Sequence, residues 1–238
     1  MYNQNNNMQA VQMDENRAAA YMTRVMGWMS AGLAISFLTA WIVYITPAIS
    51  DVIFGGFLFY GILIAQLAVV FALSAMIERM SSTTALLMFM AYATLTGLTL
   101  SVFMYIYELG SILYVLALTS ILFLVMALYG FVTRKDLTRI GSMLMFGLIG
   151  IILASIFNMF MRSEALDYLI SYVGIIIFIG LTAWDTQRIK NKYLYDTSRG
   201  ADDNSDYIQK HAIMGALILY LDFINLFLKM LRILGKRK

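Results

Sequence analysis

The chain has 238 residues, of which 61% are hydrophobic and 13% charged, and its mean hydropathy is +0.76. Soluble domains are nearer ~45–50% apolar and ~25% charged, so a water-soluble core of this length is excluded and lipid is the expected solvent. The absence of cysteine excludes disulfides, thiol catalysis and thiolate metal sites. The net charge of +3 is typical of a membrane protein with basic cytoplasmic loops, and we expect no nucleic-acid partner.

Residues 1–24 are polar and predict an N-terminal cytoplasmic tail, with an amphipathic helix around 17–24. Residues 25–233 then predict a seven-helix transmembrane domain, and 234–238 form a basic C-terminal tail. Its seven apolar runs are each long enough to cross ~30 Å of hydrocarbon; they cover 25–46, 53–75, 82–106, 111–132, 141–160, 169–187 and 211–231. The separators are short except for 188–210, which we expect to be a loop. The predicted fold class is an all-α membrane protein.

Positive charges orient this bundle. Arginines and lysines gather on the side that holds the N-terminus, whereas the opposite loops hold Arg162 alone until the chain's end. Basic loops stay in the cytoplasm, so the N-terminus is predicted to be cytoplasmic. The basic C-terminal tail is an exception, because seven full crossings would place it outside. A re-entrant last segment would keep it inside, and the charge pattern alone does not choose between the two.

The last apolar run carries a polar stripe. At 100° per residue one helix face collects six positions: His211, Gly215, Ile218, Asp222, Asn225 and Lys229. Asp222 lies about 17 Å into the helix at ~1.5 Å per residue, near the middle of the membrane. A carboxylate there costs about 2.5–3.5 kcal/mol on insertion scales and is a candidate functional group. We therefore expect this stripe to face protein or water.

A second carboxylate, Asp185, lies near the end of the sixth run, with Thr182 on its face one turn earlier. Arg79 ends the second run at a similar level, so an Arg79–Asp185 pair is geometrically allowed. Simpler roles stay open for other polar residues. Lys229 could reach the headgroups, His211 could lie at the interface, and Arg79 could anchor the cytoplasmic side.

Catalytic and nucleotide-binding motifs are missing from the sequence. No Walker A, HExxH, GxSxG or GxGxxG pattern occurs in a suitable context. Nothing pairs a nucleophile with a base, so we expect neither an enzyme nor a bound cofactor.

Several segments resemble a known family. The last run, LYLDFINLFLKMLRILG, resembles the final-helix signature of the Bax-inhibitor family (transmembrane Bax-inhibitor-motif proteins), and TAWDTQRIK is similar to that family's sixth-helix motif. Trp184 stands here where the family usually has tyrosine. IFNMF around Asn158 and LTGLTLS around Gly97 are also similar to family segments. The resemblance covers residues 25–235.

The resemblance implies a seven-helix bundle with a central last helix wrapped by the other six. It also implies a pH-sensitive calcium leak controlled by an aspartate pair, which the motifs place at Asp185 and Asp222. An arginine at the end of helix two would latch the first aspartate, and that role falls on Arg79. Family members often carry a glutamate in helix two, where this chain has Gln66, so a role for that carboxylate is not carried over.

Two carboxylates in a low dielectric cannot both ionise cheaply, so the pair is a candidate proton sensor and gate. Calcium prefers six to eight oxygens. Asp185, Asp222 and Asn225 offer fewer, so we expect a weak metal site suited to a transported ion. Protons are the expected regulator, and Thr182, His211 and Lys229 are expected to support the ion path.

A different class of function stays open. Some bacterial relatives modulate a membrane-bound AAA protease, so the chain could instead regulate such a protease, or a stress or cell-death response, through its N-terminal tail. Under both hypotheses the chain is a multi-pass integral protein of a bacterial inner membrane, in contact with the lipid bilayer.

Overall fold

The computed structural model describes residues 2–202 and 205–238, with side chains described from residue 15 onward. The described part is helical: α1 Tyr2–Ile45, α2 Pro47–Phe54, α3 Leu58–Met76, the 3₁₀ turn η1 Ile77–Arg79, α4 Ser82–Ile106, α5 Leu109–Val132, α6 Thr138–Met161, α7 Glu164–Ser198 and α8 Asp206–Leu234. Seven helices in these ranges are long and apolar enough to cross a membrane. The predicted all-α membrane fold is therefore confirmed.

Serine N-cap residues precede three of the long helices. The hydroxyls of Ser81, Ser163 and Ser205 each accept a hydrogen bond from a backbone N–H three residues later, at 3.2–3.3 Å. Such caps satisfy a donor that the first helical turn leaves unpaired. They occur at the connections between the long helices, so the chain can turn sharply there without exposing backbone groups to lipid.

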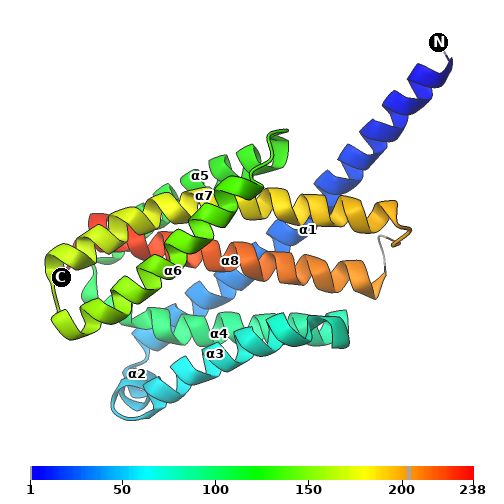
Figure 1. Cartoon of the computed structure of the whole chain (residues 1–238). Helices are drawn as coiled ribbons and strands as arrows, with labels where there is room; N and C mark the ends of the chain where they lie inside the picture. Colours follow the sequence, from blue (N-terminus) through cyan, green and yellow to red (C-terminus); the bar gives the residue numbers. More distant parts are fainter. Residues whose placement is uncertain (1, 203–204) are drawn as a thin grey trace.

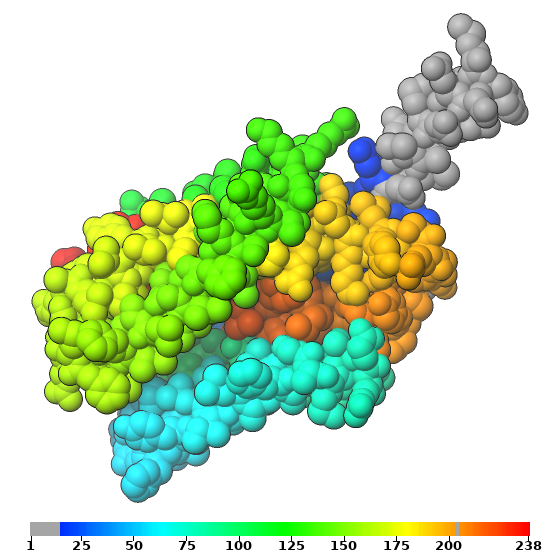
Figure 2. Space-filling view, viewed as in Figure 1, coloured from blue at the N-terminus to red at the C-terminus, as the bar shows by residue number. Residues whose placement is uncertain are grey.

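Helix α8 lies at the centre of the bundle. Its apolar stretch is 67% buried, compared with 11% for those of α3 and α6. It packs against α1, α4, α5 and α7, whereas α3 packs mainly on α4 and α6 on α7. Figure 1 shows this arrangement, and in Figure 2 only a narrow orange strip of α8 is visible between its neighbours. The prediction of a central last helix is confirmed, with α3 and α6 as the outer layer.

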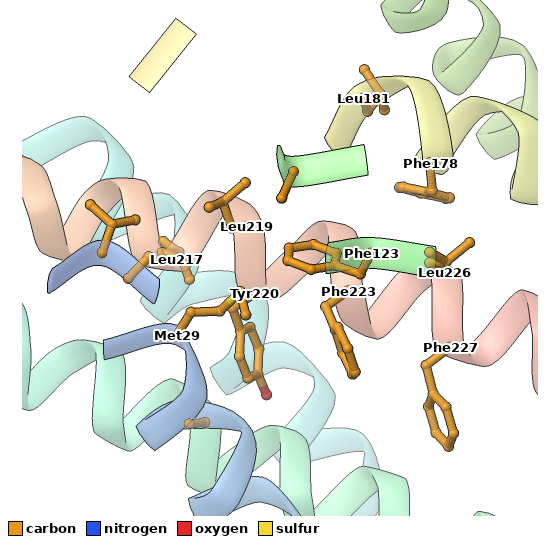
Figure 3. Packing of buried hydrophobic residues seen from close by; sticks show 14 of the residues in the cluster. Met29, Phe123, Phe178, Leu181, Leu217, Leu219, Tyr220, Phe223, Leu226 and Phe227 are labelled. Atoms are coloured by element: carbon orange, nitrogen blue, oxygen red, sulfur yellow. The ribbon is translucent and has the colours of Figure 1, made fainter. Parts of the chain in front are cut away.

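Aromatic rings fill the contact between α8 and its neighbours. Tyr220 of α8 is fully buried, and its ring meets Phe89 of α4 edge-on at 5.6 Å between centroids. Phe223 meets Phe123 of α5 in the same way at 5.4 Å. The Tyr220 hydroxyl is 2.7 Å from the hydroxyl of Ser36 on α1. Figure 3 shows Tyr220 and Phe223 projecting from the same side of α8, and these contacts join α8 to α1, α4 and α5.

Three expected boundaries differ from the structure. α1 already includes residues 15–24, and Ala18, Tyr21 and Met22 are buried, so the polar tail does not extend to residue 24. The second run is divided, because α2 ends at Phe54 and α3 begins at Leu58. The expected loop 188–210 is mostly helical, since α7 continues to Ser198. Buried packing at Tyr21 and Tyr193, whose rings stack at 4.3 Å, explains this extension.

The C-terminal segment shows that α8 crosses completely. Arg237 forms an isolated antiparallel bridge with Tyr107, which lies between α4 and α5. The backbone N–H of Glu108 also donates to the Lys236 carbonyl at 2.9 Å. This connection lies on the side opposite the N-terminus, so the chain's end does too. The re-entrant alternative is thereby excluded.

Candidate functional site

Two close contacts set how α7 and α8 lie against one another. A Cβ built at Gly215 would lie 3.1 Å from Ile189 Cγ2, and one built at Gly174 would lie 3.1 Å from Lys229 Cγ. Because the helices are antiparallel, this register puts Asp222 at the level of Thr182. Asp185 then lies about one turn nearer the cytoplasmic end. The two predicted aspartates therefore face the same region of the bundle.

Asp222 is deeply buried. Its side chain is on the fully packed face of α8 and only 6% of the residue is exposed. Its Oδ2 atom has no hydrogen-bond partner among the described residues, and the charge of Asp185 acts on it electrostatically. A buried polar atom without a partner is uncommon and costly, which makes this carboxyl the centre of the candidate site.

Asp185 is also only 6% exposed, but it has a cationic neighbour. Nη1 of Arg188, one turn further along α7, lies 3.7 Å from Asp185 Oδ1. The same guanidinium lies 5.3 Å from the ring centroid of Trp184. The family resemblance predicts Arg79 for this role. In the structure Arg79 is exposed at the end of η1, and the ion pair at Asp185 is with Arg188.

Hydroxyl groups line α7 beside the aspartates. Thr182 is fully buried and donates to the Phe178 carbonyl at 2.8 Å, and Thr186 donates to the Thr182 carbonyl at 2.7 Å. Each hydroxyl oxygen keeps acceptor capacity. Thr182 was predicted to support the site and lies at the level of Asp222, which places it with the pair.

His211 lies in a different place from the pair. Its Nε2 is 3.1 Å from Glu78 Oε1, and its Nδ1 is 2.8 Å from the Tyr207 carbonyl. Lys210 donates to the Glu78 carbonyl at 2.8 Å. His211 thus belongs to a cytoplasmic contact between η1 and the start of α8, three turns from Asp222.

Asn225 and Lys229 continue the stripe toward the outer end. The Asn225 amide donates to the Leu221 carbonyl at 2.8 Å, which leaves its oxygen available. The Lys229 stem runs over Gly174, and its charge interacts with Asp167 at the outer end of α7. The stripe is therefore continuous along α8, and its polar residues contact different neighbours.

The site offers few ligands for a metal. Among the residues with described side chains, 15–202 and 205–238, no group of three or more histidine, cysteine, aspartate or glutamate residues is placed to hold an ion. Asp185, Asp222 and the Asn225 oxygen remain the candidate oxygens. Such a sparse set would leave most of a calcium coordination shell to water.

Arg188 and Glu78 take part in these contacts without having been predicted to do so. Arg188 could have been found from its spacing, because residues three apart share a helix face and WDTQR places it three positions after Asp185. Glu78 had no comparable local signal, since its partners lie more than 130 residues away in the chain.

Comparisons with known proteins agree with this architecture. The family model described as "Inhibitor of apoptosis-promoting Bax1" matches residues 18–238. The chain is 45% identical over 219 residues to "Inner membrane protein YbhL" of Escherichia coli K12, covering 92% of both chains. It is 42% identical over 219 residues to an uncharacterized protein of Borreliella burgdorferi, again covering 92% of both. The match spans all seven transmembrane helices and both aspartates, and the chain belongs to the Bax inhibitor family of integral membrane proteins.

Proposed function

We propose that the protein is a pH-sensitive calcium leak whose gate is the Asp185–Asp222 pair. The observation that carries this proposal is the buried Asp222 carboxyl, whose Oδ2 has no partner among the described residues and which interacts with a second buried carboxyl. An acidic, oxygen-lined centre inside a membrane bundle attracts cations and protons.

Arg188 supplies the control in this proposal. Its attraction favours the ionised form of Asp185 and links that side chain to the cytoplasmic part of α7. Protonation of Asp185 removes this attraction. Because Arg188 and Asp185 lie on the same helix, this step does not itself part α7 from α8. It also removes the charge that faces Asp222 on α8, and in this proposal that change opens the path to Asp222.

The ligand set favours passage over storage. Calcium requires six to eight oxygens, so water must supply several at this pair. Weak binding allows rapid release. No nucleotide-binding motif occurs in the sequence, and we propose that the ion moves down its gradient without an enzymatic step.

The experiment is calcium flux into proteoliposomes as a function of pH, for wild type, Asp222→Asn and Asp185→Asn. The control is Asp136→Asn, which removes an exposed carboxylate in the α5–α6 turn. Hydrogen bonds from Thr138 hold the pKa of Asp136 below its usual value, so this group does not change charge over the assay range.

We expect Asp222→Asn to abolish most of the flux, because it removes the central charge. Asp185→Asn should keep flux but lose most of its pH dependence. Asp136→Asn should behave like wild type. Flux that keeps its full pH dependence in Asp185→Asn would reject the gate, and no flux in any variant, wild type included, would reject the leak.

A further inference from the structure

A groove separate from the aspartate pair lies on the side of the bundle. It encloses about 440 Å³ and is lined by residues of α1, α4, α5 and α8. It exists because α1 packs mainly on α4 and α8, while α5 packs mainly on α7 and α8. Its lining is apolar apart from the hydroxyls of Ser30, Ser36 and Ser120. An apolar concavity of this kind is typical of a ligand site.

The groove opens toward lipid. Phe37 of α1 and Leu124 of α5 line it and remain 39% and 54% exposed. Phe223 and Phe227 of α8 also line it, and Figure 3 shows their rings pointing the same way from that helix. All four residues are in membrane-spanning helices. At this depth the surrounding medium is hydrocarbon, so the occupant that fits is an acyl chain.

The basic C-terminal segment crosses the outer end of this groove. The Lys238 ammonium donates to the carbonyl of Met104 at 2.8 Å, and Met104 lines the groove. The Lys238 ammonium also donates to the Tyr44 hydroxyl at 3.3 Å, and the backbone N–H of Lys238 donates to the Ile106 carbonyl. A cation is therefore fixed where the apolar groove meets the membrane surface.

The charge of this segment is only partly balanced. Glu108 pairs with Lys236 at 2.9 Å, and Glu164 interacts with Arg237. The Tyr44 hydroxyl and the Met104 carbonyl, which accept hydrogen bonds from the Lys238 ammonium, are uncharged, and Lys238 is exposed. Basic residues on the non-cytoplasmic side are disfavoured by the usual charge bias. A phosphate ester is the anion that a membrane surface supplies at this level.

We propose that this groove binds one phospholipid of the outer leaflet, with an acyl chain along Phe223 and Phe227 and the phosphate at Lys238. The site is independent of the proposed leak, because neither aspartate lines the groove. A bound lipid would fill the gap between α1 and α5 and link the C-terminal segment to both helices.

The test is native mass spectrometry of the full chain in detergent, with added phosphatidylglycerol or with diacylglycerol of the same chains. Ala34→Trp fills the groove from α1, where Ala34 lines it and is exposed. Leu38→Trp is its control, one turn further on α1 and outside the lining, with Leu38 57% exposed. Lys238→Gln removes the cation, and Lys135→Gln is its control in the exposed α5–α6 turn.

We expect one retained phosphatidylglycerol on the wild type and on both controls. Ala34→Trp should lose both lipids. Lys238→Gln should weaken phosphatidylglycerol about fivefold, the effect of one surface cation, while leaving diacylglycerol unchanged. Equal retention in Ala34→Trp and wild type would show that the lipid lies elsewhere. If Lys238→Gln retains as much phosphatidylglycerol as the wild type, the phosphate does not bind at Lys238. If the wild type retains no lipid at all, the proposed site is wrong.

Discussion

Arg188 and Asp185 form an ion pair on one face of α7, with Nη1 of the arginine 3.7 Å from Oδ1 of the aspartate. The arginine side chain is 61% exposed and the aspartate side chain 8%. The pair therefore connects the cytoplasmic surface to a buried carboxyl. A change at the surface, in pH or in a bound partner, can reach the interior through this contact.

Replacing Arg188 with glutamine should alter the pH profile of flux. Without the guanidinium, less attraction favours the ionised carboxylate, so acid should open the leak at a higher pH. The shift should be a few tenths of a pH unit, because a partly exposed ion pair is worth about 0.2–1 kcal/mol. Calcium flux in proteoliposomes from pH 5 to 8 measures it. Arg79→Gln is the matched control and should leave the pH midpoint of flux unchanged. A larger shift in Arg79→Gln than in Arg188→Gln would show that Arg79, not Arg188, is the partner of Asp185.

Packing beside Asp185 gives a second prediction. A Cβ at Gly141 of α6 would overlap the indole ring of Trp184, whereas one at Gly150 of the same helix meets nothing within 4 Å. Gly141→Val should destabilise the protein by about 1–3 kcal/mol through overpacking and should also perturb flux, because Trp184 adjoins Asp185. Thermal unfolding in detergent and flux are the measurements. Gly150→Val should match wild type, and equal effects of the two would contradict the packing argument.

The sequence predicts the helices well because each crossing must satisfy its own backbone groups in lipid. The polar stripe on α8 also predicts that this helix is central, since charged residues avoid hydrocarbon. The extension of α7 from residue 188 to Ser198 was not predictable in this way. Its polar residues are typical of a loop, and the stacking of Tyr193 on Tyr21 that stabilises it joins distant parts of the chain.

The candidate site likewise has one part that the sequence predicts and one part that depends on long-range packing. Helical spacing, membrane depth and motif position indicated Asp185 and Asp222, and the register of α7 against α8 places the two about one turn apart along the bundle. The cationic partner depended on side-chain direction, which spacing between separate helices does not define. Arg188 is near Asp185 by helical spacing alone, whereas Arg79 would have required a particular rotation of α3 relative to α7.

Deleting residues 2–14 separates the leak from the regulator hypothesis. Among residues with described side chains, burial in α1 begins at Ala18, and the family match begins at the same residue. The shortened protein should therefore keep the wild-type flux profile in proteoliposomes. If the chain regulates a membrane AAA protease through this segment, degradation of that protease's substrates in cells should change instead. Loss of flux with intact folding would show that the segment belongs to the leak.

The contact between η1 and α8 gives the last prediction. Lys210 and His211 are buried, and both interact with the Glu78 carboxylate, at 3.6 Å and 3.1 Å. Glu78→Ala removes this acceptor and leaves two buried donors with fewer partners, which should cost about 1–3 kcal/mol. Lys210 keeps its bond to the Glu78 carbonyl, so the lower part of that range is expected.

Thermal unfolding in detergent measures this loss, with Glu15→Ala on the exposed surface of α1 as the control. Glu78→Gln keeps a hydrogen-bond acceptor and should recover part of the stability. The contact ties the end of α3 to the start of α8 on the cytoplasmic side, where the proposed gate opens. Glu78→Ala should therefore also raise basal calcium flux at neutral pH, and a variant that unfolds earlier without any rise in flux would separate this contact from gating.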